Sequence, residues 1–154
     1  MTAQTFKIRT AGALLTIGIV ALTAATAFIH LTLGGLLFLL NGLGYAGLMV
    51  LIVVAATVPH PLVARFDWFP RVALIGYAGA TIGGYLVIGP YFALGWITKG
   101  IEAALIALVI VDVFRVYGSP RRLVRRAIAL VRIRRAADAS HLEPRAPADV
   151  PEGA

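Results

Sequence analysis

Residues 36–58, LLFLLNGLGYAGLMVLIVVAATV, decide the fold class of this chain. The stretch carries no Asp, Glu, Lys or Arg, and about 20 helical residues are enough to cross the roughly 30 Å hydrocarbon core of a bilayer. Three further apolar stretches of similar length lie at residues 11–29, 72–88 and 96–116. Backbone groups in lipid must hydrogen-bond within their own segment, so each stretch is predicted to form a transmembrane helix.

The composition of the whole chain supports a membrane protein. Of 154 residues, 60% are hydrophobic and 14% charged, whereas soluble proteins average about 45–50% and about 25%. The absence of cysteine excludes a disulfide scaffold, a thiolate nucleophile and a Cys-ligated metal site. Short connections place successive helices antiparallel. We therefore expect an all-α protein, with residues 1–118 forming a transmembrane up-down-up-down four-helix bundle.

The connections and the basic residues together predict the orientation. Residues 30–35 and Gly89-Pro90 form short turns, and a longer loop runs from Pro59 to Pro70. With a cytoplasmic N-terminus, only Lys99 among the basic residues lies near the outer face. The positive-inside rule then predicts a multi-pass protein of the cell (inner or plasma) membrane with both termini cytoplasmic. The basic residues on the cytoplasmic side are Lys7, Arg9, Arg65, Arg71, Arg115 and the arginines beyond it.

The first predicted span has an alternative interpretation. Lys7 and Arg9, followed by an apolar run and Ala25-Thr26-Ala27, resemble a secretory signal peptide with a small-residue cleavage site. Such a triplet is common in an alanine-rich chain, and the run is longer than a typical signal core. We favour an uncleaved span, and cleavage leaves the orientation of the other helices unchanged.

The segment after the fourth span is basic and amphipathic. Gly118 can end the preceding helix, Ser119 can cap a new one, and Pro120 suits its first position. Residues 119–135 are predicted to form a cytoplasmic helix in the headgroup plane, either as a topology anchor or as a site for anionic lipid headgroups. No aromatic platform for nucleic acid is present. Residues 136–154 are predicted to be disordered. The candidate headgroup-binding residues are Arg121, Arg122, Arg125, Arg126 and Arg132.

Polar side chains inside the spans form the candidate site. Lys99 and Glu102 stand three residues apart on one helix face, where they can pair. The predicted topology brings several polar residues to similar depth in the outer half of the membrane. They either bind a ligand or serve only as interhelical hydrogen-bonding partners, and Lys99 could instead reach the outer interface. The candidate ligand-binding residues are His30, Asn41, Tyr45, Tyr85, Lys99 and Glu102, beside a ladder of Tyr77, Thr81 and Tyr85.

A second ionisable residue on the fourth span has a simpler interpretation. Asp112 lies near the inner end of the predicted helix and three residues before Arg115. We expect this pair only to close the helix at the cytoplasmic headgroups.

Residues 30–45, HLTLGGLLFLLNGLGY, together with residues 76–81, GYAGAT, and 94–102, LGWITKGIE, resemble a known pattern. They are similar to small, uncharacterised four-helix integral membrane proteins of bacteria and archaea, over roughly the middle two thirds of the chain. The resemblance implies the four-span fold and no activity. Alanine and arginine usage is also typical of a bacterial source. The resemblance marks for testing His30, Asn41, Tyr45, Lys99 and Glu102.

Two function classes follow from these features. The first is a small-ligand binding or transport protein that uses the outer-half cluster. The second is a structural or accessory subunit, with a membrane protein partner or a second copy of itself. An enzyme is not expected, because no Ser/His/Asp arrangement or phosphate loop occurs, although a Lys99–Glu102 acid/base pair with Tyr45 or Tyr85 as proton donor is conceivable. No cofactor and no metal are expected.

Overall fold

A computed structural model describes residues 3–119, 121–122, 124–125 and 128–129. Within these residues the chain is helical and contains no strand. The five helices are α1 (Ala3–Thr32), α2 (Leu36–Thr57), α3 (Pro61–Phe66), α4 (Phe69–Ile88) and α5 (Ala93–Tyr117).

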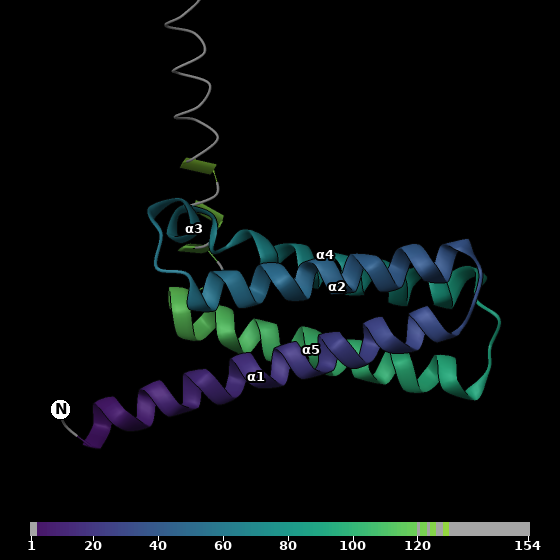
Figure 1. The fold of residues 1–154 in the computed structure, drawn as a ribbon, viewed down its shortest axis with the longest axis horizontal. Coiled ribbons are helices and arrows are strands. Elements are labelled where there is room, and N and C mark those ends of the chain that lie inside the picture. The colour runs from purple at the N-terminus through teal and green to yellow at the C-terminus, as the bar shows by residue number, and fades with distance from the viewer. Residues whose placement is uncertain (1–2, 120, 123, 126–127, 130–154) are drawn as a thin grey trace, which may run out of the picture.

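The four long helices lie side by side (Figure 1). Helix α1 packs on α2 and α5, while α4 packs on α5 and α2. The α1–α2 turn and the α4–α5 connection meet at one end, and short α3 lies at the other. Gly34 and Gly35 make the α1–α2 turn possible, because both adopt a positive φ, of 73° and 83°.

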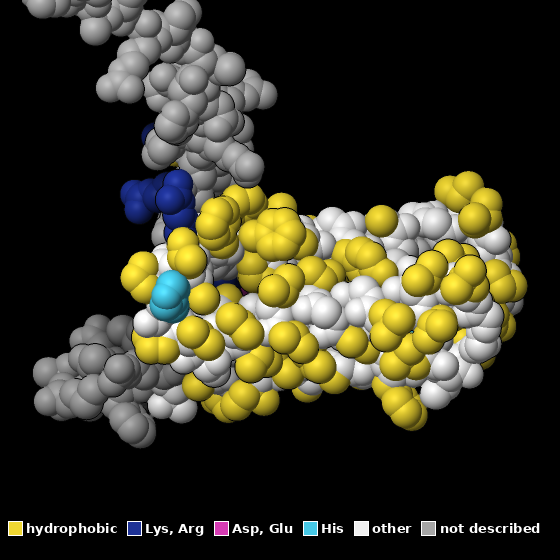
Figure 2. Space-filling model, turned by 45° about the horizontal axis from the view of Figure 1, so that its top comes forward, with side chains coloured by type: hydrophobic (Ala, Val, Ile, Leu, Met, Phe, Trp, Pro, Cys, Tyr) yellow, Lys and Arg dark blue, Asp and Glu magenta, His cyan; other side chains and the backbone are white. Residues whose placement is uncertain are grey.

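Three of these helices are long and apolar enough to cross a membrane: Thr10–Thr32 within α1, all of α2 and all of α4. Hydrophobic side chains cover the visible face of the helices, and basic side chains gather near one end (Figure 2). Many large apolar residues are exposed, among them Leu36, Val87 and Ile88. In water such a surface would be costly, whereas lipid solvates it well. Within the described residues the predicted all-helical fold is confirmed, and the three apolar helices support a membrane protein.

Helix α3 was not expected, because residues 59–70 were predicted to be a loop. The ring of His60 caps this helix, as its Nδ1 accepts the backbone N–H of Leu62 at 3.2 Å. Pro61 occupies the first turn, where a missing N–H has no consequence. Helix α4 likewise has proline in its first turn and begins at Phe69, three residues before the predicted start.

Helix α5 places three of its four charged residues on one buried stripe. Lys99, Glu102 and Asp112 face inward together with Leu105 and Val109. The residues recur every three or four positions, which is the spacing of one helix face. The fourth, Arg115, is exposed in the last turn. Other exposed residues of the helix are Trp96, Ile97, Ile110, Val111 and Phe114.

The structure describes only part of the predicted basic helix. Arg121, Arg122 and Arg125 are helical and exposed. Ser119 caps this segment as predicted, because its Oγ accepts the backbone N–H of Arg122 at 3.4 Å. Arg126, Arg132 and the tail of residues 136–154 lie outside the described residues.

Candidate functional site

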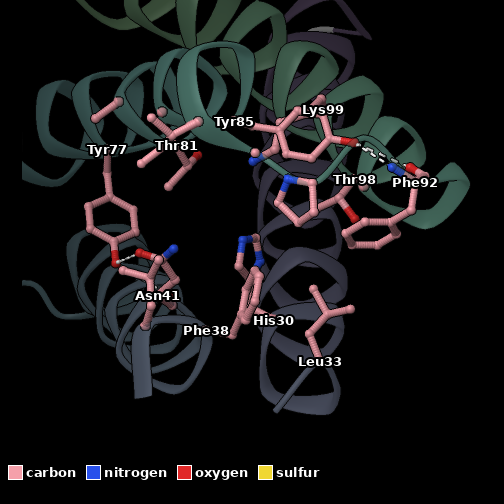
Figure 3. Close-up of a pocket in the computed structure, with 17 residues that line it drawn as sticks. His30, Leu33, Phe38, Asn41, Tyr77, Thr81, Tyr85, Phe92, Thr98 and Lys99 are labelled. Atoms are coloured by element: carbon pink, nitrogen blue, oxygen red, sulfur yellow. Dashed lines mark hydrogen bonds between the residues drawn. The ribbon is translucent and has the colours of Figure 1, made fainter. Parts of the chain in front are cut away.

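A half-open cavity of about 330 Å³ lies at the end of the protein that holds the α1–α2 and α4–α5 connections (Figure 3). All four long helices contribute to it. His30 comes from α1, Asn41 from α2, Thr81 from α4 and Lys99 from α5. Most of the wall is apolar, including Leu33, Leu37, Phe38, Ile88, Pro90 and Phe92. Ligand cavities commonly combine an apolar wall with a few placed polar groups.

Lys99 of the cavity wall forms an ion pair with Glu102, which lies behind the wall. Lys99 Nζ donates to Glu102 Oε2 at 2.6 Å. Lys99 is 9% exposed and Glu102 is fully buried. The predicted pairing across one helical turn is therefore confirmed. A buried charge is costly without a partner, and this pair gives each residue one.

His30 faces the same carboxylate from α1. Its Nδ1 lies 2.8 Å from the carbonyl oxygen of Thr26, which can only accept, so Nδ1 carries a hydrogen. Its Nε2 lies 3.8 Å from Glu102 Oε1, and that buried oxygen accepts no hydrogen bond from the described residues. A second hydrogen on the imidazole would therefore face the unsatisfied carboxylate oxygen.

Two hydrogen-bonded contacts join α2 to α4 beside the cavity. The Tyr45 hydroxyl lies 2.9 Å from Thr81 Oγ1, and the Tyr77 hydroxyl donates to Asn41 Oδ1 at 3.2 Å. The rings of Tyr45 and Tyr77 meet edge to face, with centroids 4.9 Å apart. Gly44 permits this approach, because a Cβ there would collide with the Tyr77 hydroxyl. Tyr77 and Asn41 lie across the cavity from His30 and Lys99 (Figure 3).

An aromatic cluster borders the cavity at the α4–α5 connection. The Tyr85 hydroxyl donates to the carbonyl of Phe92 at 3.3 Å and accepts its N–H at 3.2 Å. The Tyr85 ring also meets the ring of Trp96 edge to face, and Lys99 Nζ lies 5.6 Å from the ring centroid of Tyr85. Gly95 leaves room for this ring, since a Cβ there would come within 2.5 Å of the Tyr85 hydroxyl.

The predicted cluster is brought together, although its members differ in access. His30, Asn41, Tyr85 and Lys99 line the cavity. Tyr45 and Glu102 do not line it, and both are fully buried behind the lining residues. Sequence reasoning left out other lining residues. The Tyr77–Thr81–Tyr85 spacing signalled two of them, whereas nothing in the sequence singled out Phe38, Phe92 and Thr98.

A second ionic cluster lies toward the other end of α5. Asp112 Oδ1 accepts from Nη2 of Arg115 at 2.7 Å, so their predicted pairing is confirmed. Arg71 of α4 also binds Asp112, with Nε 2.7 Å from Oδ2, and this contact was missed. Arg71 is itself buried, and its Nη1 donates to the carbonyl of Asp67. Asp112 therefore joins α4 to α5 as well as closing a helix end.

The described residues contain no group of three or more His, Asp or Glu residues placed to hold a metal ion. Comparison with known proteins found no family model, no curated protein and no solved structure that matches this chain. The three apolar helices support a helical membrane protein. The cavity and the polar residues around it are the features from which its function can be inferred.

Proposed function

We propose that this chain is a multi-pass protein with four membrane-spanning helices, in which α5 lies beside α1, α2 and α4. Helix α5 has 25 residues, which corresponds to a length of about 37 Å, enough for a hydrocarbon core of about 30 Å. Lys99, Glu102 and Asp112 face the interior, the exposed Arg115 lies only in the last turn, and much of the outward face is apolar. A charged residue in a span is expected to face the bundle interior in this way.

The proposed orientation places both termini in the cytoplasm of a bacterial cell. Arg65, Arg121, Arg122 and Arg125 are exposed at the end that holds α3. Lys99 lies near the other end and is paired with Glu102. This asymmetry follows the positive-inside rule. We propose that the exposed arginines bind anionic lipid headgroups of the cytoplasmic leaflet, because basic residues near the membrane surface are attracted to them.

Single-cysteine labelling tests this topology cleanly, because the chain has no cysteine of its own. We expect Thr32→Cys and Tyr91→Cys to react in intact cells with a membrane-impermeant maleimide, since both positions are exposed near the outer connections. His60→Cys and Ser119→Cys should react only after the membrane is permeabilised. If Tyr91→Cys and Ser119→Cys reacted under the same conditions, α5 would not cross the membrane. If His60→Cys reacted in intact cells while Thr32→Cys and Tyr91→Cys did not, the orientation would be the opposite of the one proposed.

We infer that the function of this membrane protein is to bind a small molecule in the cavity above Lys99 and Glu102. One observation carries this proposal: a half-open cavity of about 330 Å³ is lined by Lys99, a buried lysine that pairs with Glu102 behind the wall. If these polar residues served only to hydrogen-bond the helices together, no cavity would be needed. The Tyr45–Thr81 contact already provides an interhelical hydrogen bond. Intramembrane charges beside a cavity mark ligand and ion sites.

Filling the cavity tests this function. Gly84 lines the cavity, and a Cβ added there meets open space, so Gly84→Phe should occupy the cavity without disturbing the helix. Gly83→Phe is the matched control, because the neighbouring glycine also has open space but does not line the cavity. We expect native mass spectrometry of gently extracted protein to show a small-molecule adduct on the wild type and on Gly83→Phe. The adduct should fall at least tenfold on Gly84→Phe, and equal adducts or a bare wild type would refute the proposal.

A further inference from the structure

The hydroxyl groups of the cavity wall already use their hydrogens within the protein. Thr81 donates to the carbonyl of Ala78 at 2.9 Å, and Thr98 donates to the carbonyl of Leu94 at 2.7 Å. Tyr77 donates to Asn41, and Tyr85 donates to Phe92. The hydroxyl hydrogens of the wall are therefore taken, and these groups can meet a ligand only as acceptors.

Two groups in the cavity keep hydrogens to donate. An ammonium group has three N–H bonds, and Lys99 uses one of them on Glu102 in the described residues. Asn41 accepts from Tyr77 through Oδ1, while its Nδ2 donates to no described residue. The two residues come from α5 and α2 and line the same cavity. A ligand that fits them presents oxygen acceptors, and a charged acceptor forms the stronger bond with an ammonium group.

The carboxylate of Glu102 faces two nitrogen-bearing side chains beneath the cavity. Glu102 pairs with Lys99 through Oε2, and its Oε1 faces His30 Nε2 at 3.8 Å. Because the contact with Glu102 uses only one ammonium hydrogen, Lys99 keeps the others for a ligand.

The shape of the cavity indicates the rest of the ligand. Its volume is at the low end of the range of about 300–1,000 Å³ for ligand pockets, so it holds a small head and the start of a chain. Leu37 on α2 and Gly84 and Ile88 on α4 line the cavity and are also exposed. The opening therefore lies on the α2–α4 side, where the surface is apolar and faces lipid.

We propose that the ligand is a single-chain amphiphile with a carboxylate head, which binds Lys99 and Asn41 while its apolar chain leaves between α2 and α4. This inference rests on the proposed ligand-binding function and names the chemistry of its ligand. Binding forms and breaks no covalent bond and needs no cofactor. Recognition of the carboxylate depends on two donors, the ammonium group of Lys99 and the amide of Asn41, in a largely apolar cavity.

The protein carries its own reporter for this test. Of its two tryptophans, Trp96 contacts Tyr85 of the cavity wall, with ring centroids 5.4 Å apart, and Trp68 lies before α4 at the far end. In a Trp68→Phe background, fluorescence from Trp96 alone can be followed in lipid nanodiscs. The probes are decanoate, methyl decanoate and decylamine, which share one chain and differ in head charge. In each titration the fluorescence change is plotted against the concentration of probe in the membrane.

We expect decanoate to saturate at a concentration at least tenfold lower than methyl decanoate, and decylamine not to saturate. The Lys99→Met/Glu102→Met variant should lose this preference, and Gly84→Phe should abolish saturation by all probes. Asn41→Asp, which keeps the shape of the side chain but replaces its donor amide by a negative charge, should weaken decanoate at least tenfold even if the double variant fails to fold. Gly83→Phe should behave as wild type.

Three results would overturn the carboxylate assignment: equal saturation by decanoate and its ester, saturation that persists in Gly84→Phe, or no saturation by decanoate. None of them alone removes the proposed function. That function fails if the adduct seen by native mass spectrometry is absent from the wild type or equally present on Gly84→Phe. The two proposals therefore fail in distinguishable ways.

Discussion

Replacing Glu102 alone by methionine is expected to lower the free energy of unfolding by about 3–5 kcal/mol, because Lys99 is then buried without its counter-charge. Replacing both residues, in Lys99→Met/Glu102→Met, removes the two charges together and puts apolar groups of similar size in their place. Such exchanges are often neutral or stabilising in buried pairs. The double variant should therefore be far more stable than Glu102→Met.

Unfolding in mixed micelles of increasing dodecyl sulfate fraction, followed by circular dichroism, measures this difference. Trp96→Phe serves as a control on the same helix, because its ring is 52% exposed and carries no charge. If Glu102→Met lowered the free energy of unfolding only slightly, and no more than the double variant, Lys99 would reach solvent once unpaired. That result would contradict the prediction that a single substitution leaves a charge buried.

Asp112→Asn is expected to lower the free energy of unfolding by about 3–5 kcal/mol for the same physical reason. Asp112 is 2% exposed and binds Arg71 of α4 and Arg115 of α5 through separate oxygens. The amide keeps the shape and removes the charge, so Arg71 remains buried without a counter-ion. The α4–α5 contact near the end that holds α3 should loosen.

Arg115→Met is the matched control for Asp112→Asn. Its side chain is 37% exposed, and partly exposed pairs contribute about 1 kcal/mol or less. The same micelle titration should therefore rank Asp112→Asn well below Arg115→Met in stability. If the two variants were equal, Asp112 would act only at its own helix end, as the sequence alone indicates.

The apolar stretches made the long helices predictable, because lipid leaves few alternatives for a backbone. The helix boundaries agree to within a few residues for α2, and less well for α1 and α4, which begin earlier than their apolar parts. Hydropathy detects the membrane-crossing part of a helix and not its extension beyond the lipid. Helix α3 was missed because it has only six residues, which is too short for a repeating apolar pattern to show in the sequence.

The site was predictable where its partners lie on one helix. Lys99 and Glu102 are three residues apart, so helix geometry alone predicts their contact. Contacts between helices depend on rotation about each helix axis, which composition does not fix. The Arg71–Asp112 pair spans 41 residues and the Tyr45–Thr81 contact spans 36, and neither was expected. The cavity itself arises from the gaps between four helices and has no sequence signature.

We propose that the cavity binds a small molecule through Lys99, which pairs with Glu102. One comparison tests this whatever the chemical identity of the ligand. Native mass spectrometry should be applied to gently extracted wild type, Lys99→Met/Glu102→Met and Arg71→Met/Asp112→Met, the last removing a buried pair away from the cavity. We predict that a small-molecule adduct stays on the wild type and on Arg71→Met/Asp112→Met, and is lost from folded Lys99→Met/Glu102→Met. Retention of the same adduct by all three proteins, or a shared protein partner with no adduct, would contradict the claim.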